Sequence, residues 1–272
     1  MKIFLPTDFS KQSGYAEQVA VAFAKMANAE IHLFHSVKTP VDWKKISTKD
    51  ENKYPEAKKQ ISDAKVEMDA FATKHKEIKV TRDIGYNLAH EDIPMFAEKE
   101  KADLIIMGGH GESGYDEEHL GSHSRKVLRN TRVPLLLIRK KPAKTLPLKI
   151  IVTSDFDEKS VKELRKVADT LSFLKPDLHL LFVNSPLHFQ NSDETEKQLH
   201  KAAKLIGVAP SHCHIFNYRF IEDGIQRFCE LKKADAVVFI SKSKKSFLGG
   251  LNYSYTENTA EMVDVPVFVF KA

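Results

Sequence analysis

The chain contains an internal repeat, which restricts its fold more than any other feature of the sequence. Residues 149–156 match residues 2–9 at an offset of 147, and the same offset places His179 over His32. Further along, the offset is 132 in four matches: Asp235 over Asp103, Ile225 over Ile93, Phe228 over Phe96, and Val265-Pro266 over Val133-Pro134. Duplication of one structural unit produces self-similarity of this kind. We therefore expect two similar units, the second shorter by 15 residues.

The first unit alternates between strand-like and helix-like segments. Apolar runs at 2–6, 31–37, 104–107 and 133–138 predict strands, and Ile78 begins a weaker one. Between these runs, apolar residues recur at three- and four-residue steps, which is typical of amphipathic helices. The alternation predicts an α/β fold with parallel strands and right-handed crossovers.

Two stretches read as lying outside the core. Residues 38–53 are polar and lysine-rich around the lone Trp43, which predicts an excursion from the fold. Residues 139–147 are charged and carry two prolines, which is typical of a linker. Nine residues reach about 30 Å at full extension, so the two units must be neighbours. We place the first unit at 1–140, the linker at 141–147 and the second unit at 148–272.

Composition argues against several classes of protein. Net charge is only +5 over 272 residues, and lysines and glutamates are interspersed, so the basic stripe of a nucleic-acid binder is not evident. No apolar run approaches the length of a membrane span, and Asp8 follows too early for a signal-peptide core. Two cysteines make no disulfide framework. We expect a cytoplasmic protein that binds neither nucleic acid nor membrane.

The stretch from Leu104 to Ile138 is the candidate ligand site. A buried strand ends at Met107, glycines follow at Gly108, Gly111 and Gly121, and Ser122 precedes a helix-like run. A strand that leads into glycines and then a helix start presents backbone N–H groups to a phosphate. The alternative is that these glycines serve only turns.

The second copy provides an internal comparison for these glycines. At an offset of 132, Gly108, Gly111, Gly121 and Ser122 are replaced by Ile240, Ser243, Tyr253 and Ser254. Side chains at the glycine positions would obstruct a phosphate, which predicts a ligand in the first half and none in the second. Gly249 and Gly250 could build a different loop there.

These residues resemble those of a tandem universal stress protein, with two UspA-type domains over nearly the whole chain. The Gly-x2-Gly-x9-Gly-Ser pattern at Gly108, Gly111, Gly121 and Ser122 matches the ATP-binding motif of the family's nucleotide-binding branch. The segment Pro6-Thr7-Asp8-Phe9-Ser10 matches its first-strand motif. The resemblance implies two tandem open parallel sheets of order 3-2-1-4-5 with helices on both faces, an adenine-nucleotide α-hydrolase-like fold. It also implies halves that pair like a dimer, and it admits a homodimer.

The resemblance also implies roles for individual residues. Pro6, Thr7 and Asp8 would lie at the nucleoside end of an ATP site, and Ser36 would offer backbone groups to the adenine. The remaining site residues follow the fourth strand: Met107 and Gly108 by the ribose, Gly111 by the phosphates, and Gly121, Ser122, His123 and Ser124 around the phosphate tail. We expect the second half to serve pairing and regulation.

Four acids qualify the ATP prediction. Glu112, Asp116, Glu117 and Glu118 lie between the second and third glycines, where they either point to solvent or require Mg²⁺ between themselves and the phosphates. No catalytic base can be named, so we expect at most slow ATP hydrolysis. The alternatives are an interaction or scaffold module of the same fold that binds no nucleotide, and, less favoured, an enzyme of the wider adenine-nucleotide α-hydrolase-like group.

Histidines form two further groups. His212 and His214 share one face of an expected strand, and His110, His119 and His123 surround the glycine loop. Neither group shows a fourth ligand at a spacing characteristic of metal sites, so we expect surface or loop histidines and assign no metal ligands; a metal site is the less favoured alternative. Asp8 and Asp155 stand at equivalent strand ends, and Asp155 persists in the half that lost its glycines. This persistence favours a role for both aspartates that is at least partly structural.

Overall fold

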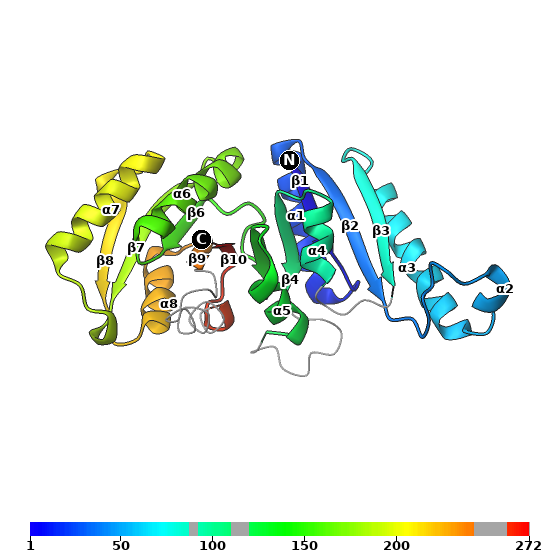
Figure 1. Cartoon of the computed structure of the whole chain (residues 1–272). Helices are drawn as coiled ribbons and strands as arrows, with labels where there is room; N and C mark the ends of the chain where they lie inside the picture. The colour runs from blue at the N-terminus through cyan, green and yellow to red at the C-terminus, as the bar shows by residue number, and fades with distance from the viewer. Residues whose placement is uncertain (87–91, 110–119, 242–259, 272) are drawn as a thin grey trace.

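The structure is a computed structural model that describes residues 1–86, 92–109, 120–241 and 260–271. Its first half alternates strands and helices in the predicted order (Figure 1). The strands are β1 (Lys2–Pro6), β2 (Glu30–Val37), β3 (Val80–Tyr86), β4 (Leu104–Gly108) and β5 (Leu135–Ile138). The helices are α1 (Lys11–Ala27), α2 (Thr48–Glu51), α3 (Pro55–Lys74), α4 (Asp92–Lys99) and α5 (Ser122–Asn130).

The second half repeats this alternation. Its strands are β6 (Lys149–Thr153), β7 (Asp177–Asn184), β8 (Cys213–Asn217), β9 (Ala236–Ser241) and β10 (Val267–Lys271). Its helices include α6 (Glu158–Leu171), α7 (Ser192–Ile206) and α8 (Ile221–Lys232). Three short 3-10 turns lie at Ser172–Leu174, Pro186–His188 and Pro210–His212. None of the helices in the described part of the chain has the length and apolarity that crossing a bilayer requires.

The ten strands form one sheet in the order β3-β2-β1-β4-β5-β10-β9-β6-β7-β8. The first half therefore has the predicted order 3-2-1-4-5, and the second half has the same order in its own numbering. Neighbouring strands are parallel except at the centre of the sheet, where β5 pairs antiparallel with β10. The predicted fold class is confirmed, and Figure 1 shows β3 and β8 at opposite ends of the sheet.

The repeat is visible in individual interactions. The carboxylate of Asp103 accepts the backbone N–H of Lys2 (2.7 Å), and that of Asp235 accepts the backbone N–H of Lys149 (2.9 Å). Residues with left-handed backbone also recur in register: Phe9 with Phe156, Asn28 with Lys175, and Lys101 with Lys233. Residues other than glycine rarely adopt a positive φ, so its recurrence at equivalent positions indicates that both halves contain the same turns.

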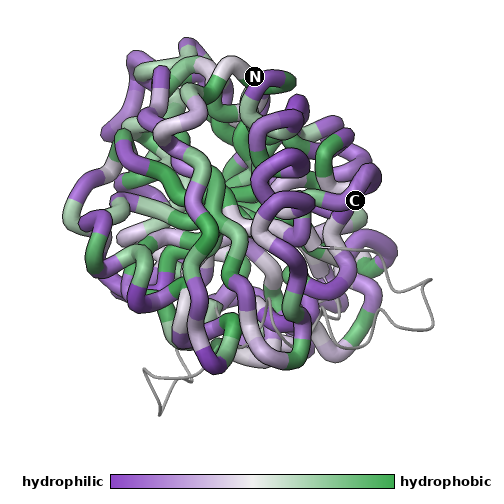
Figure 2. Tube along the Cα trace, turned by 90° about the vertical axis from the view of Figure 1, so that its left-hand side faces the viewer, coloured by the Kyte–Doolittle hydropathy of each residue, from purple (hydrophilic) through white to green (hydrophobic). Residues whose placement is uncertain are grey.

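Two apolar layers cover the sheet, as the predicted helices on both faces require. Buried residues of α1, α3, α6 and α7 form one layer, and those of α4, α5 and α8 form the other. Figure 2 shows apolar residues along the central strands and hydrophilic residues on the outer parts of the helices. Each layer spans both halves: the ring of Phe23 on α1 lies 5.3 Å from Phe173 and 6.4 Å from Phe268, measured between centroids.

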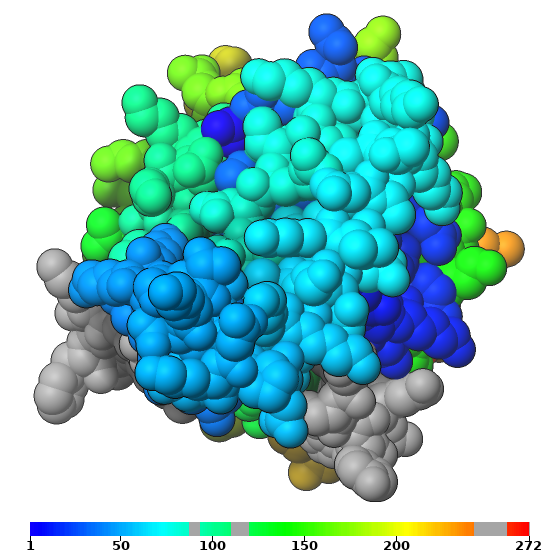
Figure 3. Space-filling view, turned by 90° about the vertical axis from the view of Figure 1, so that its right-hand side faces the viewer, coloured from blue at the N-terminus to red at the C-terminus, as the bar shows by residue number. Residues whose placement is uncertain are grey.

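The segment between β2 and α3 differs from the prediction. Trp43 is only 9% exposed and belongs to the same apolar layer as α3. Its ring packs edge-on against Tyr54, with centroids 6.5 Å apart. The expectation that residues 38–53 lie outside the core is thus wrong at Trp43, because burial of a large indole anchors an otherwise polar segment. The remainder forms a raised lobe beside α3 (Figure 3).

Candidate functional site

The candidate site lies where the strand order of the first half reverses. After β1 the chain continues to β2 on one side of β1, and later returns to β4 on the other side. In open α/β sheets, ligands bind outside the carboxyl ends of the strands at this switch point. The turns that follow β1, β2 and β4 therefore define the site.

The turn after β1 is held by its own side chains. Thr7 Oγ1 donates to Glu17 Oε1 (2.9 Å) and accepts the N–H of Phe9 (3.0 Å). The Asp8 carboxylate accepts the N–H of Ser10 (3.0 Å), and Ser10 caps α1 through the N–H of Ser13. The Thr7 hydroxyl is therefore engaged within the protein, and Asp8 shapes the turn.

The second half repeats the Asp8 interaction. Asp155 accepts the N–H of Asp157 (3.5 Å) and the hydroxyl of Ser160 (2.8 Å). An aspartate that binds the backbone two residues on supports a turn. The predicted structural share of Asp8 and Asp155 is thus confirmed.

Glu17 is a site residue that sequence reasoning missed. It lies on α1 ten residues after Thr7, and burial raises the pKa of its carboxyl group, while the hydrogen bond from Thr7 acts in the opposite direction. Glu17 is not part of the buried face of α1, so the periodicity of that helix gave no signal for it. Its partner became clear only from the folded chain.

At the end of β2, the predicted residue Ser36 is exposed and pairs in register with Gly85 of β3. The neighbouring His35 joins β2 to β1, because its Nδ1–H donates to the carbonyl of Thr7 (2.8 Å). The β1 ladder ends where the N–H of Thr7 donates to the carbonyl of Phe34 (2.9 Å). Backbone groups alternate in direction along a strand, so those of Ser36 point to the same side as those of Phe34, beyond the end of β1.

At the end of β4, Met107 and Gly108 face the protein interior. The Met107 side chain is 6% exposed and lies in the apolar layer with α4 and α5. A Cβ atom on Gly108 would lie 3.2 Å from backbone atoms of Gln12 and Ser13 in α1. Gly108 therefore has a packing reason to be glycine, which the comparison between the two halves did not reveal.

The glycine loop is closed by a hydrogen bond between its two ends. The N–H of Gly121 donates to the carbonyl of Gly109 (3.0 Å), and the N–H of Gly109 donates to the carbonyl of Ile138 (2.8 Å). Gly121 is the N-cap of α5 and, having no side chain, leaves the first-turn N–H groups without a side-chain cap. Its φ of −59° suits any residue, so backbone strain does not explain the glycine.

The first turn of α5 contains the other predicted phosphate ligands. Ser122 and His123 are exposed, whereas Ser124 is 3% exposed. The Ser124 hydroxyl donates to the carbonyl of Gly108 (3.1 Å), so it fastens α5 to β4. The Ser124 hydroxyl is therefore not available to donate to a ligand, and Ser124 could donate to a phosphate only through its backbone N–H.

Glu261, from the second half, also reaches this helix start. Its carboxylate lies 2.6 Å from the guanidinium of Arg125 and accepts the N–H of Leu120 (3.3 Å). The side chain of Arg139 in turn donates to the carbonyl of Ala260 (3.0 Å). No local signal in the sequence links Glu261 to a loop about 140 residues earlier, so this contact could not be predicted.

Some predicted positions lie outside the described residues. These are Gly111, the acids Glu112, Asp116, Glu117 and Glu118, the histidines His110 and His119, and Ser243, Gly249, Gly250, Tyr253 and Ser254 of the second copy. Ile240, which replaces Gly108, is described and is 8% exposed. Its side chain is therefore accommodated within the second half.

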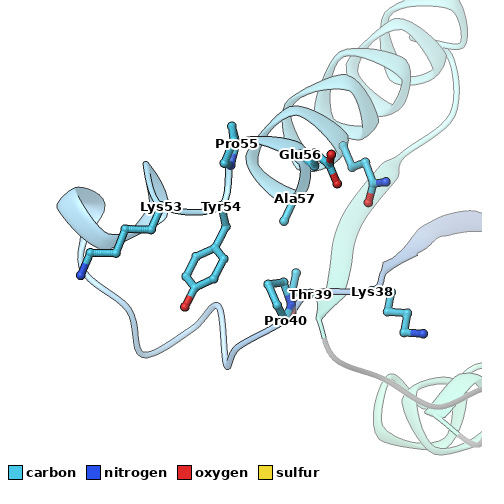
Figure 4. A pocket seen from close by; sticks show the side chains of 9 residues that line it. Lys38, Thr39, Pro40, Lys53, Tyr54, Pro55, Glu56 and Ala57 are labelled. Atoms are coloured by element: carbon cyan, nitrogen blue, oxygen red, sulfur yellow. The ribbon is translucent and has the colours of Figure 1, made fainter.

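A pocket of about 520 Å³ lies beyond the end of β2 (Figure 4). It is formed by the segment after β2 and by the start of α3, and no sequence pattern predicted it. Its lining includes Lys38, Thr39, Pro40, Tyr54 and Ala57. Because Lys38 follows Ser36 by two residues, the pocket lies next to the candidate site.

Comparison with known proteins decides the family. The model of the universal stress protein family matches residues 1–139. The chain belongs to this family. Two universal stress proteins of Methanocaldococcus jannaschii are similar to it: MJ0577 is 29% identical over 52% of this chain and 95% of the relative, and MJ0531 is 32% identical over 51% and 82%.

Among solved structures, a universal stress protein from Archaeoglobus fulgidus DSM 4304 is similar to this protein. The match covers 99% of the present chain and 98% of the Archaeoglobus chain. Its TM-score is 0.73 and its identity 20%, which shows a shared fold over the whole chain. The family resemblance predicted from the glycine pattern and the first-strand segment is therefore confirmed.

Proposed function

We propose that this universal stress protein binds ATP in its first half. The observation that carries the proposal is the start of α5, where Gly121 caps the helix without a side chain and is held beside β4 by the Gly109 carbonyl (3.0 Å). Backbone N–H groups and the positive end of a helix suit a phosphate chain. In the proposal, Gly111, Gly121, Ser122, His123 and the N–H of Ser124 surround the phosphates.

The nucleoside would lie between the ends of β1, β2 and β4. The Ser36 backbone points past the end of β1, as adenine recognition by N–H and carbonyl groups requires. The Asp8 carboxylate, which accepts the N–H of Ser10, would also accept a sugar hydroxyl, because a carboxylate offers about four lone-pair positions. Pro6 and Thr7 would shape this end through their backbone, and Met107 and Gly108 would line the ribose side through theirs.

The second half would serve pairing and regulation. In the proposal, residues 1–140 and 148–272 are two units joined by 141–147. Pairing is supported by the antiparallel β5–β10 contact and by the apolar layers that span both halves. Regulation is supported by Glu261, which reaches Arg125 and Leu120 at the edge of the proposed phosphate site.

Nucleotide content tests the proposal directly. The full chain, purified without added nucleotide, is denatured, and the released small molecules are identified by mass spectrometry. A parallel thermal-shift titration compares ATP-Mg²⁺ with GTP-Mg²⁺ and inorganic triphosphate. We expect ATP to stabilise the protein most, and an equal response to all three would contradict adenine recognition.

A second candidate function is an interaction module that binds no nucleotide. It is favoured by the Glu261 carboxylate, which already occupies one N–H group before α5 and the guanidinium of Arg125. Absence of both released nucleotide and any thermal shift at saturating ATP-Mg²⁺ would support this function in place of ATP binding.

A further inference from the structure

We propose that the second half carries a site for a divalent transition metal, built from Asp177, His179 and His212. One ligand atom from each of these residues lies within 4.8 Å of the others. The site is separate from the proposed ATP site, because β7 and β8 lie at the outer end of the second half, whereas β1 and β4 lie in the middle of the first half (Figure 1).

Strand register brings the three ligands together. Asp177 and His179 are two residues apart at the start of β7, so they share a face of the sheet. Leu180 pairs with Cys213 and Leu181 with His214, which places His212 beside His179 at the start of the edge strand β8. The Cys213 side chain is not a fourth ligand, because its Sγ lies 3.7 Å from the Leu199 carbonyl toward α7.

Asp177 already binds both imidazoles. Its two carboxylate oxygens lie 3.2 Å from His179 Nε2 and 3.2 Å from His212 Nδ1. The two rings are stacked, with centroids 4.2 Å apart and planes 19° apart. Ligand atoms around tetrahedral Zn²⁺ are about 3.4 Å apart, close to the distances from Asp177 to the two imidazoles. An imidazole binds a metal through a lone pair in the plane of its ring, so the two stacked rings would have to tilt toward a shared ion.

Solvent access favours loading of the ion. Side-chain exposure is 44% for Asp177, 36% for His212 and 9% for His179. The buried His179 provides a fixed ligand, and the two partly exposed side chains can adjust around an entering ion. Three protein ligands leave a fourth position for water or for a ligand from another molecule.

His214 completes the arrangement as a positioning residue. His179 Nδ1 lies 3.0 Å from His214 Nε2, so one of these nitrogens must donate to the other. Without a metal, His214 Nε2–H donates to His179 Nδ1, and His179 Nε2–H donates to Asp177. With a metal on His179 Nε2, His179 carries its proton on Nδ1 and donates it to His214 Nε2, and His214 carries its own proton on Nδ1. A metal-bound histidine commonly donates its other N–H in this way, which fixes its tautomer.

Charge at the site is compatible with a cation. The Lys232 ammonium opposes a metal ion electrostatically, but it lies over the ring of Phe228, 5.6 Å from the centroid, and the Asp177 carboxylate offsets it.

The first half shows the same position without a metal set. Glu30 and His32 correspond to Asp177 and His179 at the offset of 147. In register with His32 stands Thr81, whose hydroxyl lies 2.9 Å from His32 Nδ1. Glu30 is bound instead by Lys79, at 2.6 Å. Thr81 therefore occupies the position that corresponds to His212, and it shows that threonine is compatible with this place in the sheet. The substitution His212→Thr would remove the second imidazole in the same way.

Zinc binding to the untagged full chain tests the proposal. Competition with a chromophoric chelator should show one Zn²⁺ per chain, and His212→Thr or Asp177→Asn should each weaken it at least 10-fold. His200→Thr is the matched control, because His200 is an exposed histidine of the same half and should leave the affinity unchanged. Equal affinity in wild type, His212→Thr and Asp177→Asn would overturn the proposal, as would absence of stoichiometric binding.

A second measurement does not depend on the variants folding well. Long-range ¹H–¹⁵N spectra of the wild-type histidine rings are compared with and without one equivalent of Zn²⁺. We expect His179 to change from the Nε2–H to the Nδ1–H tautomer. Zinc-induced changes confined to other histidines would refute the assignment.

Discussion

The most direct test of the ATP site is Gly121→Val. The Gly121 backbone, at φ −59° and ψ 151°, lies in a region open to valine, so the fold should survive. Loss of a favourable N-cap residue costs about 0.5–1.5 kcal/mol, which lowers the Tm by about 1–5 °C. The valine side chain would occupy the approach to the first-turn N–H groups of α5, so we expect ATP binding to be abolished.

Thermal shift separates these two effects. At a hundred times Kd, ATP-Mg²⁺ should stabilise the wild type by about 2.7 kcal/mol, or about 5–10 °C in Tm, and the Gly121→Val variant not at all. Tyr253→Gly is the matched control, because it changes the corresponding position of the second copy and should keep the full shift. A wild-type shift in Gly121→Val, or a loss of the shift in Tyr253→Gly alone, would refute the assignment of the ATP site to the first half.

Three further predictions concern the residues around the site. Gly108→Ala should destabilise the protein by about 1–3 kcal/mol in urea unfolding, with or without ATP, because the added Cβ meets the α1 backbone at 3.2 Å; an unchanged midpoint would show that α1 can shift freely. Glu261→Gln should tighten ATP binding about two- to five-fold by calorimetry, because it releases Arg125 and removes a negative charge; weaker binding would mean that Glu261 supports the site instead. Glu17→Gln should raise the free energy of unfolding at pH 7 and change it little near pH 4, as measured by urea unfolding at both pH values. Burial raises the pKa of Glu17 in the folded protein, so the wild type loses stability as the pH rises through that pKa, and glutamine avoids this loss. A larger gain at acidic pH would contradict the prediction.

Interactions between residues close in sequence were the most predictable part of the fold. The Ser10 cap of α1, the Asp8 and Asp155 turns and most strand positions follow from local patterns, since each involves groups only a few residues apart. The internal repeat also made one long-range feature predictable. It identified Asp103 and Asp235 as equivalent positions, and the structure shows that they make equivalent hydrogen bonds to Lys2 and Lys149.

The candidate site was predictable as a location but less so in its details. The glycine spacing indicated a loop between β4 and α5, and the structure describes both of its ends. The donor roles changed, however, because the Thr7 and Ser124 hydroxyls bind Glu17 and Gly108. Trp43 likewise entered the core, although its neighbours in sequence are polar.

The sequence by itself determined the family, the duplicated α/β fold and the position of the glycine loop, because these depend on periodicity and on spacing along one chain. Tertiary structure alone decided which distant groups meet. The register of β7 with β8 brings His212 to His179, and the meeting of the two halves brings Glu261 to Arg125. Such contacts arise from strand pairing and layer packing, whose geometry is set by the whole core and leaves no periodic signal in the residues that it joins.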